Sequence, residues 1–117
     1  MNNFTIYHNP RCSKSRQTLE LIKEQGIDPE IILYLEEPPS VENLTKLLRL
    51  LKIEPRDLLR KGEEEYKTLN LKDETIDDYT IITHMSENPR LIERPIVIFN
   101  DRAIIGRPPE NVLKLIN

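Results

Sequence analysis

The sequence contains few of the residues that form disulfides and metal sites. Its 117 residues include one cysteine and two histidines. A single cysteine cannot form a disulfide within the chain, which excludes a self-contained dithiol cycle, so any redox turnover needs a thiol from another molecule. Structural zinc sites use four Cys or His side chains, more than this chain contains. We therefore expect no metal and no tightly bound cofactor.

The sequence also lacks long apolar runs and a basic stripe. No apolar segment approaches the roughly 20 residues of a membrane-spanning helix, and the polar N-terminus does not resemble a signal peptide. The formal net charge is −3, which argues against a nucleic-acid partner. We expect a cytoplasmic protein without a membrane partner, because a lone reactive thiol is best kept in a reducing compartment.

Acidic residues are absent from the first part of the chain. Residues 1–19 contain Arg11, Lys14 and Arg16 and no acid, so this stretch has a formal charge of +3 while the rest of the chain has −6. The positive charge is local, and it surrounds Cys12. Such surroundings favour a bound anion and a lowered cysteine pKa, particularly at a helix N-terminus.

Cys12 lies where a predicted strand gives way to a predicted helix. Residues 4–7 alternate as a strand does, and a helical spacing begins at Ser13. The thiol would then lie at or just before the first helical turn, close to unpaired backbone N–H groups, and His8 is expected to add part of a further positive charge. A lone cysteine is often a small buried hydrophobe, but burial among unpaired cations is costly. The sequence therefore predicts a reactive thiol, whose thiolate form is the nucleophile.

The pattern of the two ends of the chain predicts an α/β fold. A helix over 13–26 is followed by an apolar run at 30–34, which is typical of a buried parallel strand. Together with the first strand they form a right-handed strand–helix–strand unit. Residues 95–99 and 102–105 predict a hairpin with a tight turn between them.

The middle of the chain, residues 40–88, is predicted to be helical, and a last helix is predicted around Val112, Leu113 and Ile116. The order is then strand–helix–strand, a helical block, and strand–strand–helix. This is the layout of a thioredoxin-like fold with a helical insertion. We expect residues 1–117 to form a single domain, since no linker or repeat interrupts them.

Local signals divide the helical region. Ser40 is the predicted N-cap of its first helix, and Pro55 is the predicted first residue of a short helix through Arg60. Thr75 and Asp78 resemble a capping box. The helix that this box opens is predicted to turn four side chains inward, namely Ile76, Tyr79, Ile82 and Met85.

Five segments of the sequence resemble the ArsC family of glutathione- and glutaredoxin-dependent arsenate reductases. They are HNPRCSKSR at 8–16, YLEEPPS at 34–40, LLRK at 58–61, RPIVIF at 94–99 and GRPPE at 106–110. The resemblance runs essentially end to end. It implies a thioredoxin-like fold with a helical insertion and the reduction of arsenate to arsenite. It also implies that glutathione is a co-substrate and glutaredoxin a partner.

Six residues match functional positions of that family. Cys12 matches the nucleophile, and His8 and Ser15 match residues that help to lower the pKa of the thiol. The resemblance implies that three arginines bind the oxyanion and stabilise the arsenic intermediates, namely Arg60, Arg94 and Arg107. Guanidinium groups suit this task because their fixed fork of donors matches tetrahedral oxyanions. The Arg94-Pro95 dipeptide also suggests a cis peptide bond beside the site.

The residues around the nucleophile do not identify the substrate. Arg11 and Lys14 flank Cys12, whereas characterised arsenate reductases of the family often carry small residues there, which points to a broader ArsC-like branch. In that branch arsenate is not the assured substrate, and another oxyanion or an organic disulfide is an alternative. Taken singly, each matching arginine could be an ordinary surface charge, and His84 has no assigned role.

Three other classes of protein share part of the pattern. An Spx-like regulator that binds RNA polymerase has a similar fold, but its redox switch is a C-x-x-C pair, and Ser15 occupies the second position here. A tyrosine-phosphatase-type loop needs Cys-x5-Arg, and this chain has Thr18 at that position. A monothiol glutaredoxin-like protein would hold glutathione or an iron–sulfur cluster, but its usual glycine and aromatic residues are missing. The sequence therefore favours the arsenate reductase.

Overall fold

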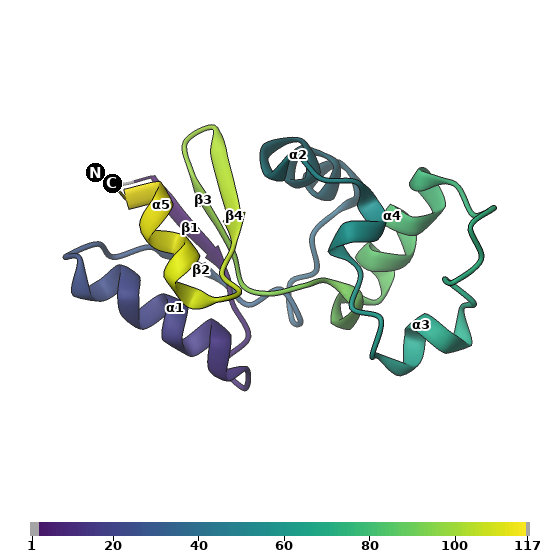
Figure 1. Ribbon diagram of the computed structural model, residues 1–117, viewed down its shortest axis with the longest axis horizontal. Coiled ribbons are helices and arrows are strands. Elements are labelled where there is room, and N and C mark those ends of the chain that lie inside the picture. Colours follow the sequence, from purple (N-terminus) through teal and green to yellow (C-terminus); the bar gives the residue numbers. More distant parts are fainter. Residues whose placement is uncertain (1–2, 117) are drawn as a thin grey trace. The chain divides into compact units, whose positions relative to one another are not determined.

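The chain forms two compact units. The computed structural model describes residues 3–116, and Figure 1 shows how the chain runs through them. The sheet unit contains residues 3–37 and 94–116, and the helical unit contains residues 38–93. The two ends of the chain thus build one unit, and the middle builds the other. None of the helices in the described part is long and apolar enough to cross a membrane.

The sheet unit contains a mixed four-stranded sheet in the order β2-β1-β3-β4. Strand β1 (Phe4–Tyr7) pairs in parallel with β2 (Glu30–Ile32). On its other side, β1 pairs antiparallel with β3 (Ile96–Phe99), which forms a hairpin with β4 (Arg102–Ile105). Asn100 in the hairpin turn has a positive φ of 57°, a conformation that asparagine tolerates better than most residues. This is the thioredoxin-like arrangement that the sequence predicts.

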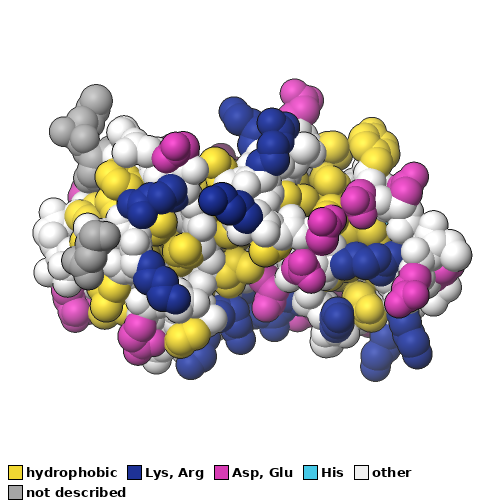
Figure 2. Space-filling model, turned by 45° about the horizontal axis from the view of Figure 1, so that its top comes forward, with side chains coloured by type: hydrophobic (Ala, Val, Ile, Leu, Met, Phe, Trp, Pro, Cys, Tyr) yellow, Lys and Arg dark blue, Asp and Glu magenta, His cyan; other side chains and the backbone are white. Residues whose placement is uncertain are grey.

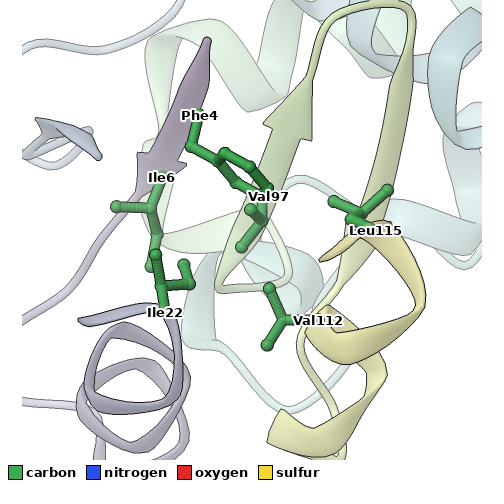
Figure 3. Close-up of a cluster of buried hydrophobic side chains, with 6 residues drawn as sticks. All are labelled: Phe4, Ile6, Ile22, Val97, Val112 and Leu115. Atoms are coloured by element: carbon green, nitrogen blue, oxygen red, sulfur yellow. The ribbon is translucent and has the colours of Figure 1, made fainter. Parts of the chain in front are cut away.

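Two helices of the sheet unit cover one face of the sheet. They are α1 (Ser13–Glu24) and α5 (Leu113–Ile116), which follows a 3-10 turn at Pro109–Val112. Alternate residues of a strand point to the same face, and strand side chains from one face meet helix side chains in the core (Figure 3). The buried cluster consists of Phe4, Ile6, Ile22, Val97, Val112 and Leu115. Gly26, with a φ of 78°, ends α1 in the conformation that glycine adopts most easily.

The second strand differs from the expectation. The run at 30–34 was expected to be a buried strand, but β2 ends at Ile32, and both Glu30 and Ile31 are exposed. The reason is the position of β2 at the edge of the sheet, where it has a strand on one side only. Tyr34, beyond the end of β2, is the residue of the run that is fully buried, at 1% exposure. The prediction of a parallel strand is confirmed, and the prediction of its burial is wrong.

The helical unit contains three helices and two 3-10 turns, in keeping with the predicted helical character of residues 40–88. They are α2 (Val41–Leu51), α3 (Glu64–Thr68) and α4 (Asp78–Glu87), with 3-10 turns at Pro55–Leu58 and Pro89–Leu91. Helix α2 packs against α4. Each of the two helices buries one apolar face, made of Leu44, Leu47 and Leu48 on α2 and of Ile81, Ile82 and Met85 on α4.

Two helix starts follow the predicted signals. The Ser40 hydroxyl accepts a hydrogen bond from the backbone N–H of Asn43 at 3.0 Å, so the predicted N-cap of α2 is confirmed. Pro55 begins a short helix as expected. This helix is a single 3-10 turn that ends at Leu58, so Arg60 lies beyond it and not within it as predicted.

The predicted capping box of α4 is wrong. Asp77 is the N-cap, and its carboxylate accepts a hydrogen bond from the backbone N–H of Thr80 at 2.9 Å. The Asp73 carboxylate instead accepts hydrogen bonds from the backbone N–H and from the hydroxyl of Thr75, at 2.9 and 2.7 Å. The buried face of α4 is formed by Ile81, Ile82 and Met85. Tyr79 lies away from this face and is 68% exposed, not turned inward as predicted.

Charges of both signs are mixed over the surface. The chain has 17 Lys and Arg residues and 20 Asp and Glu residues. On the face shown in Figure 2, basic and acidic side chains lie interspersed. That face offers a nucleic acid no continuous basic track, in keeping with the acidic net charge.

Candidate active site

Cys12 is the N-cap residue of α1, as the sequence predicts. Its backbone is extended, with φ −96° and ψ 122°, and its carbonyl accepts the hydrogen bond of Arg16 at 3.0 Å that opens the helix. Its own N–H donates to the carbonyl of Asn9 at 3.0 Å, so the loop turns tightly just before the helix. No acidic residue lies in the first turn of α1. The sulfur is therefore placed at the positive end of a helix with no carboxylate beside it in that turn.

The Cys12 sulfur has three hydrogen-bond donors around it. Partial burial on its own raises the pKa of the thiol, because burial disfavours the charged form. The backbone N–H groups of Ser15 and Lys14 and the guanidinium of Arg94 donate to the sulfur, and the positive charge of Arg94 acts in the same direction. Together these donors outweigh the burial, and the pKa of Cys12 is lowered. The site therefore favours a thiolate.

His8 and Ser15 form a buried pair behind the thiol loop. His8 Nδ1 lies 2.6 Å from Ser15 Oγ, and the same hydroxyl accepts a hydrogen bond from the backbone N–H of Asn9 at 3.0 Å. Ser15 is fully buried and His8 is 6% exposed. The hydroxyl thus ties the end of β1 to the first turn of α1, and it fixes the backbone N–H of Ser15 that points at the sulfur.

The surroundings of His8 disfavour the positive charge that the sequence suggested. Burial lowers the pKa of His8 by disfavouring its charged form, and the charges of Arg16 and Lys23 lower it further. A neutral imidazole with its proton on Nε2 accepts a hydrogen bond at Nδ1 from the Ser15 hydroxyl. The lowered pKa therefore argues against the expected partial cation at His8, because the side chain is buried close to other cations.

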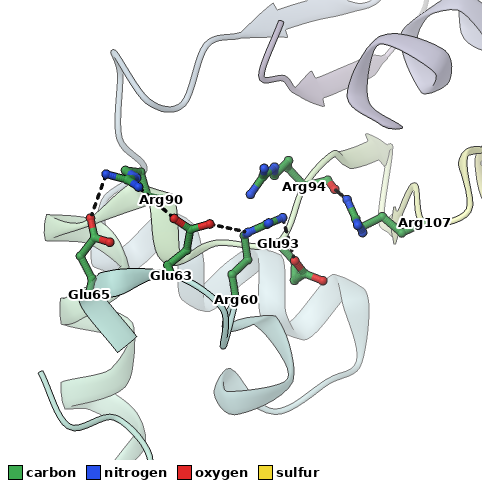
Figure 4. Close-up of polar contacts among 7 residues, drawn as sticks. All are labelled: Arg60, Glu63, Glu65, Arg90, Glu93, Arg94 and Arg107. Atoms are coloured by element: carbon green, nitrogen blue, oxygen red, sulfur yellow. Dashed lines mark hydrogen bonds and ion pairs between the residues drawn. The ribbon is translucent and has the colours of Figure 1, made fainter. Parts of the chain in front are cut away.

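Two of the three predicted anion-binding arginines belong to the sheet unit. Arg94 directly precedes β3, its peptide bond to Pro95 is cis as predicted, and its guanidinium donates to the Cys12 sulfur. The Nε–H of Arg94 is buried and has no hydrogen-bond partner among the described residues. Arg107 is exposed, and its Nη1 lies 3.5 Å from the carbonyl oxygen of Arg94, a long contact. Figure 4 shows Arg94 and Arg107 joined in this way.

Arg60, the third of these arginines, belongs to the helical unit. Its Nε lies 3.3 Å from a carboxylate oxygen of Glu63, and its Nη1 lies 3.3 Å from a carboxylate oxygen of Glu93. The Arg60 side chain is 21% exposed. Arg60 is thus a partly buried cation held by two acids within its own unit (Figure 4).

The other cations of the thiol loop have different surroundings. Arg11 and Lys14 are exposed, and only the backbone N–H of Lys14 contacts the sulfur. In addition to its charge, the Arg16 guanidinium donates a hydrogen bond to the carbonyl of Pro10 at 2.8 Å and so holds the loop. The Asn9 side chain accepts the backbone N–H of Arg11 at 3.0 Å, a local turn contact that the Asn-Pro dipeptide could have indicated.

A surface pocket of about 350 Å³ lies beside the thiol loop, within the sheet unit. It is lined by His8, Asn9, Pro10, Arg11, Leu33, Leu35 and Glu36. It therefore combines a cation, a carboxylate and apolar side chains, a mixture that suits a small zwitterionic ligand. Elsewhere, residues 3–116 contain no group of three Cys, His, Asp or Glu side chains that could hold a metal ion.

Comparison with known proteins assigns the chain to a family. A sequence profile of the ArsC family matches residues 7–115. An uncharacterized protein of Escherichia coli K12, YfgD, is 52% identical over 95% of this chain and 94% of its own length. An arsenate reductase of Haemophilus influenzae is 47% identical over 95% of this chain and 97% of its own length.

A solved structure has the same fold. The arsenate reductase of Vibrio cholerae superposes with a TM-score of 0.95 at 52% sequence identity, and the match covers 97% of each chain. This likeness supports the thioredoxin-like fold over almost the whole length of the chain.

Proposed function

Because the chain belongs to the ArsC family, we propose that it reduces arsenate to arsenite with the Cys12 thiolate as the nucleophile. The observation that carries the proposal is the environment of the sulfur. It accepts hydrogen bonds from two helix N-terminal N–H groups and from Arg94, and its pKa is lowered as a result. A thiolate at neutral pH beside an arginine is what nucleophilic attack on an anionic centre requires.

The first step forms a bond between the Cys12 sulfur and arsenic. One As–O bond breaks, and the oxygen leaves as water after taking up protons, so arsenic stays pentavalent. Arg94 has a buried Nε–H without a partner among the described residues. We infer that this donor and the exposed Arg107 bind the arsenate oxygens. Donors fixed in advance at the position of developing charge are the most effective form of such stabilisation.

Two further thiols complete the reduction. Glutathione forms a second S–As bond with loss of water. A glutaredoxin thiolate then attacks the glutathione sulfur, and the electron pair of that S–As bond passes to arsenic, which becomes trivalent. Hydrolysis of the remaining S–As bond releases arsenite and restores the Cys12 thiol. The two electrons come from two external thiols, which end as one mixed disulfide, so a chain with one cysteine is sufficient.

Glutathione is the proposed thiol co-substrate, in the reducing cytoplasm where it is abundant. The pocket beside the thiol loop supports this proposal, because Arg11 and Glu36 lie in its wall together with two leucines. Glutathione carries two carboxylates and one amine. The positive charge of Arg11 can bind a carboxylate, and the negative charge of Glu36 can bind the amine. Omission of glutathione or of glutaredoxin from the assay tests whether each is needed.

The experiment is an arsenate-dependent assay with glutathione, glutaredoxin, glutathione reductase and NADPH. Cys12→Ser is expected to abolish NADPH oxidation, because a hydroxyl is a far weaker nucleophile than a thiolate. Arg94→Ala is expected to reduce turnover by at least about tenfold, the effect of removing one fixed donor to a developing anion. Thermal unfolding of each variant shows whether it is folded.

The outcomes separate the substrate from the thiol site. Activity retained in Cys12→Ser would contradict the proposal outright. A wild-type chain that shows no turnover, but whose Cys12 is rapidly alkylated at neutral pH, would keep the reactive thiol and reject arsenate as the substrate. Another oxyanion or an organic disulfide would then be assayed with the same variants.

A further inference from the structure

Arg60 is held by two acids that come from different segments of the helical unit. Glu63 follows it by three residues and accepts a hydrogen bond from its Nε, whereas Glu93 comes from the end of the unit and accepts from its Nη1, both at 3.3 Å. Figure 4 shows the guanidinium lying between the two carboxylates. The side chains of Arg60, Glu63 and Glu93 are 21%, 18% and 29% exposed, so water screens these contacts only in part.

The backbone fixes the two segments against each other. Leu59 and Ile92 form an isolated antiparallel bridge. On either side of it, the N–H of Arg60 donates to the carbonyl of Leu91 at 2.7 Å, and the N–H of Glu93 donates to the carbonyl of Leu58 at 2.9 Å. The Cα positions of Arg60 and Glu93 are therefore tied together, and the ion pair between their side chains is an addition to a fixed frame.

Glu63 is itself held from the other side. Its second carboxylate oxygen accepts a hydrogen bond from Nη2 of Arg90 at 3.1 Å, and Arg90 also lies 3.8 Å from a carboxylate oxygen of Glu65. A carboxylate with both oxygens engaged has little freedom to rotate. Glu63 therefore presents one oxygen to Arg60 in a single orientation.

The network leaves part of Arg60 unused. A guanidinium has five N–H groups, and two of those on Arg60 have partners within the described residues. None of the Arg60 nitrogen atoms is both buried and without a partner among the described residues, so Nη2, to which neither acid binds, reaches solvent. These donors are therefore available to water or to a ligand with several acceptor oxygens.

The network also carries more acid than base. Three carboxylates, Glu63, Glu65 and Glu93, face two guanidinium groups, Arg60 and Arg90. Arg60 itself faces two of these carboxylates, Glu63 and Glu93. A bound oxyanion would gain hydrogen bonds from Arg60 but would feel repulsion from its two carboxylate partners.

We propose that Glu63 and Glu93 are positioning residues that hold Arg60 with its unused N–H groups available to an oxyanion, and that their charge weakens oxyanion binding. This inference rests on the proposed function and on the role that the resemblance to the family implies for Arg60, namely binding of the oxyanion. The two acids thus have opposite effects, since their hydrogen bonds orient Arg60 while their charge limits its affinity for an anion.

Substitution by Gln or by Ala separates the two effects. Glu93→Gln keeps a hydrogen-bond acceptor for Arg60 and removes the charge, so KM for arsenate should fall by about twofold to fivefold with kcat nearly unchanged, as expected for one partly exposed ion pair. Glu93→Ala also removes the acceptor, so Arg60 loses its fixed orientation and kcat should fall by about fivefold or more. Glu63→Gln and Glu63→Ala should follow the same pattern.

Glu65→Gln is the matched control. Glu65 belongs to the same network, with a similar exposure of 23%, but it pairs with Arg90 rather than with Arg60. Both kinetic constants should therefore stay at their wild-type values in Glu65→Gln. Since KM need not equal a dissociation constant, arsenate binding is also measured directly, from the arsenate concentration that halves the rate of Cys12 alkylation by iodoacetamide.

The outcomes distinguish this inference from the proposed function. The inference would be overturned if kcat and KM for arsenate were the same in wild type and in the Glu63 and Glu93 variants, or if KM rose in Glu93→Gln. Either result would leave the proposed arsenate reductase activity unaffected. A wild-type chain that is protected by arsenate but does not turn it over would reject the proposed function alone, and tighter protection of Glu93→Gln would then still support the inference. Absence of any protection of wild type by arsenate would overturn the inference too.

Discussion

Arg94 donates a hydrogen bond to the sulfur of Cys12, although the two residues lie near opposite ends of the chain. The contact arises because β3, which follows Arg94, pairs directly with β1, which leads into the thiol loop. Arg94 is thus the guanidinium that acts on the thiol, whereas the side chain of the adjacent Arg11 is exposed.

Arg94→Ala should raise the pKa of Cys12. The substitution removes a hydrogen bond and a positive charge that both favour the thiolate, while the opposing effect of burial remains. The measurement is the pH dependence of iodoacetamide alkylation, whose midpoint should move to higher pH. Arg11→Ala, at an exposed neighbour of the cysteine, is the control and should leave the midpoint in place. A midpoint that does not move in Arg94→Ala would contradict the assignment of this contact.

Ser15→Ala should destabilise the fold by about 1–3 kcal/mol, the range for leaving buried polar groups without partners. The hydroxyl is fully buried and bonds both to His8 Nδ1 and to the backbone N–H of Asn9. Urea unfolding measures the change in the free energy of unfolding. Ser13→Ala, two residues earlier and exposed, should change it little. Equal losses in the two variants would mean that the buried pair has no special importance.

The lowered pKa of His8 predicts a loss of stability at mildly acidic pH. The unfolded chain takes up a proton at His8 as the pH falls below about 6.5, the ordinary value, whereas the folded chain resists this because His8 is buried and lies near Arg16 and Lys23. The unfolded state then binds more protons, so the free energy of unfolding falls as the pH decreases through this window. The contribution of His8 to the free energy of unfolding is fully present above this pH window.

The measurement for His8 is the free energy of unfolding between about pH 5 and pH 7, the window of an ordinary histidine. His8→Gln should flatten the slope, since glutamine does not titrate. Asp73 and Asp77 also have lowered pKa values, through hydrogen bonds from Thr75 and Thr80, but their ordinary value of 3.8 places their effect at lower pH. An unchanged slope in His8→Gln would show that His8 is not the group responsible.

Gly106→Ala should destabilise the sheet unit by about 1–3 kcal/mol through overpacking. A Cβ at this position would lie 2.6 Å from the Thr18 hydroxyl and 2.8 Å from Cγ of Pro95. Thr18 is fully buried on α1, so the neighbouring atoms have little room to move. Gly62→Ala is the matched control, because no atom lies within 4 Å of the added Cβ. Thermal or urea unfolding compares the two variants, and equal stability would show that the approach of Gly106 to α1 is not required.

The local features of this protein follow from the sequence alone. The strand before Cys12, the helix after it, the hairpin at 95–105 and the cap at Ser40 depend on side-chain spacing and on hydrogen bonds between near neighbours. These interactions are complete within a few residues, so periodicity and turn chemistry are enough to predict them. The same reasoning places a thiol at a helix N-terminus with no acid close by in the sequence.

The tertiary structure alone decided which charges reach the sulfur and which groups are buried. Arg94 reaches Cys12 through strand pairing. The side chain of Lys14, which is close to Cys12 in the sequence, is exposed. The charged form of His8 is disfavoured, and Glu30 and Ile31 of β2 are exposed, because of what surrounds them in space. Electrostatic and desolvation energies depend on spatial distance and on access of water, and neither is fixed by the separation of residues along the chain.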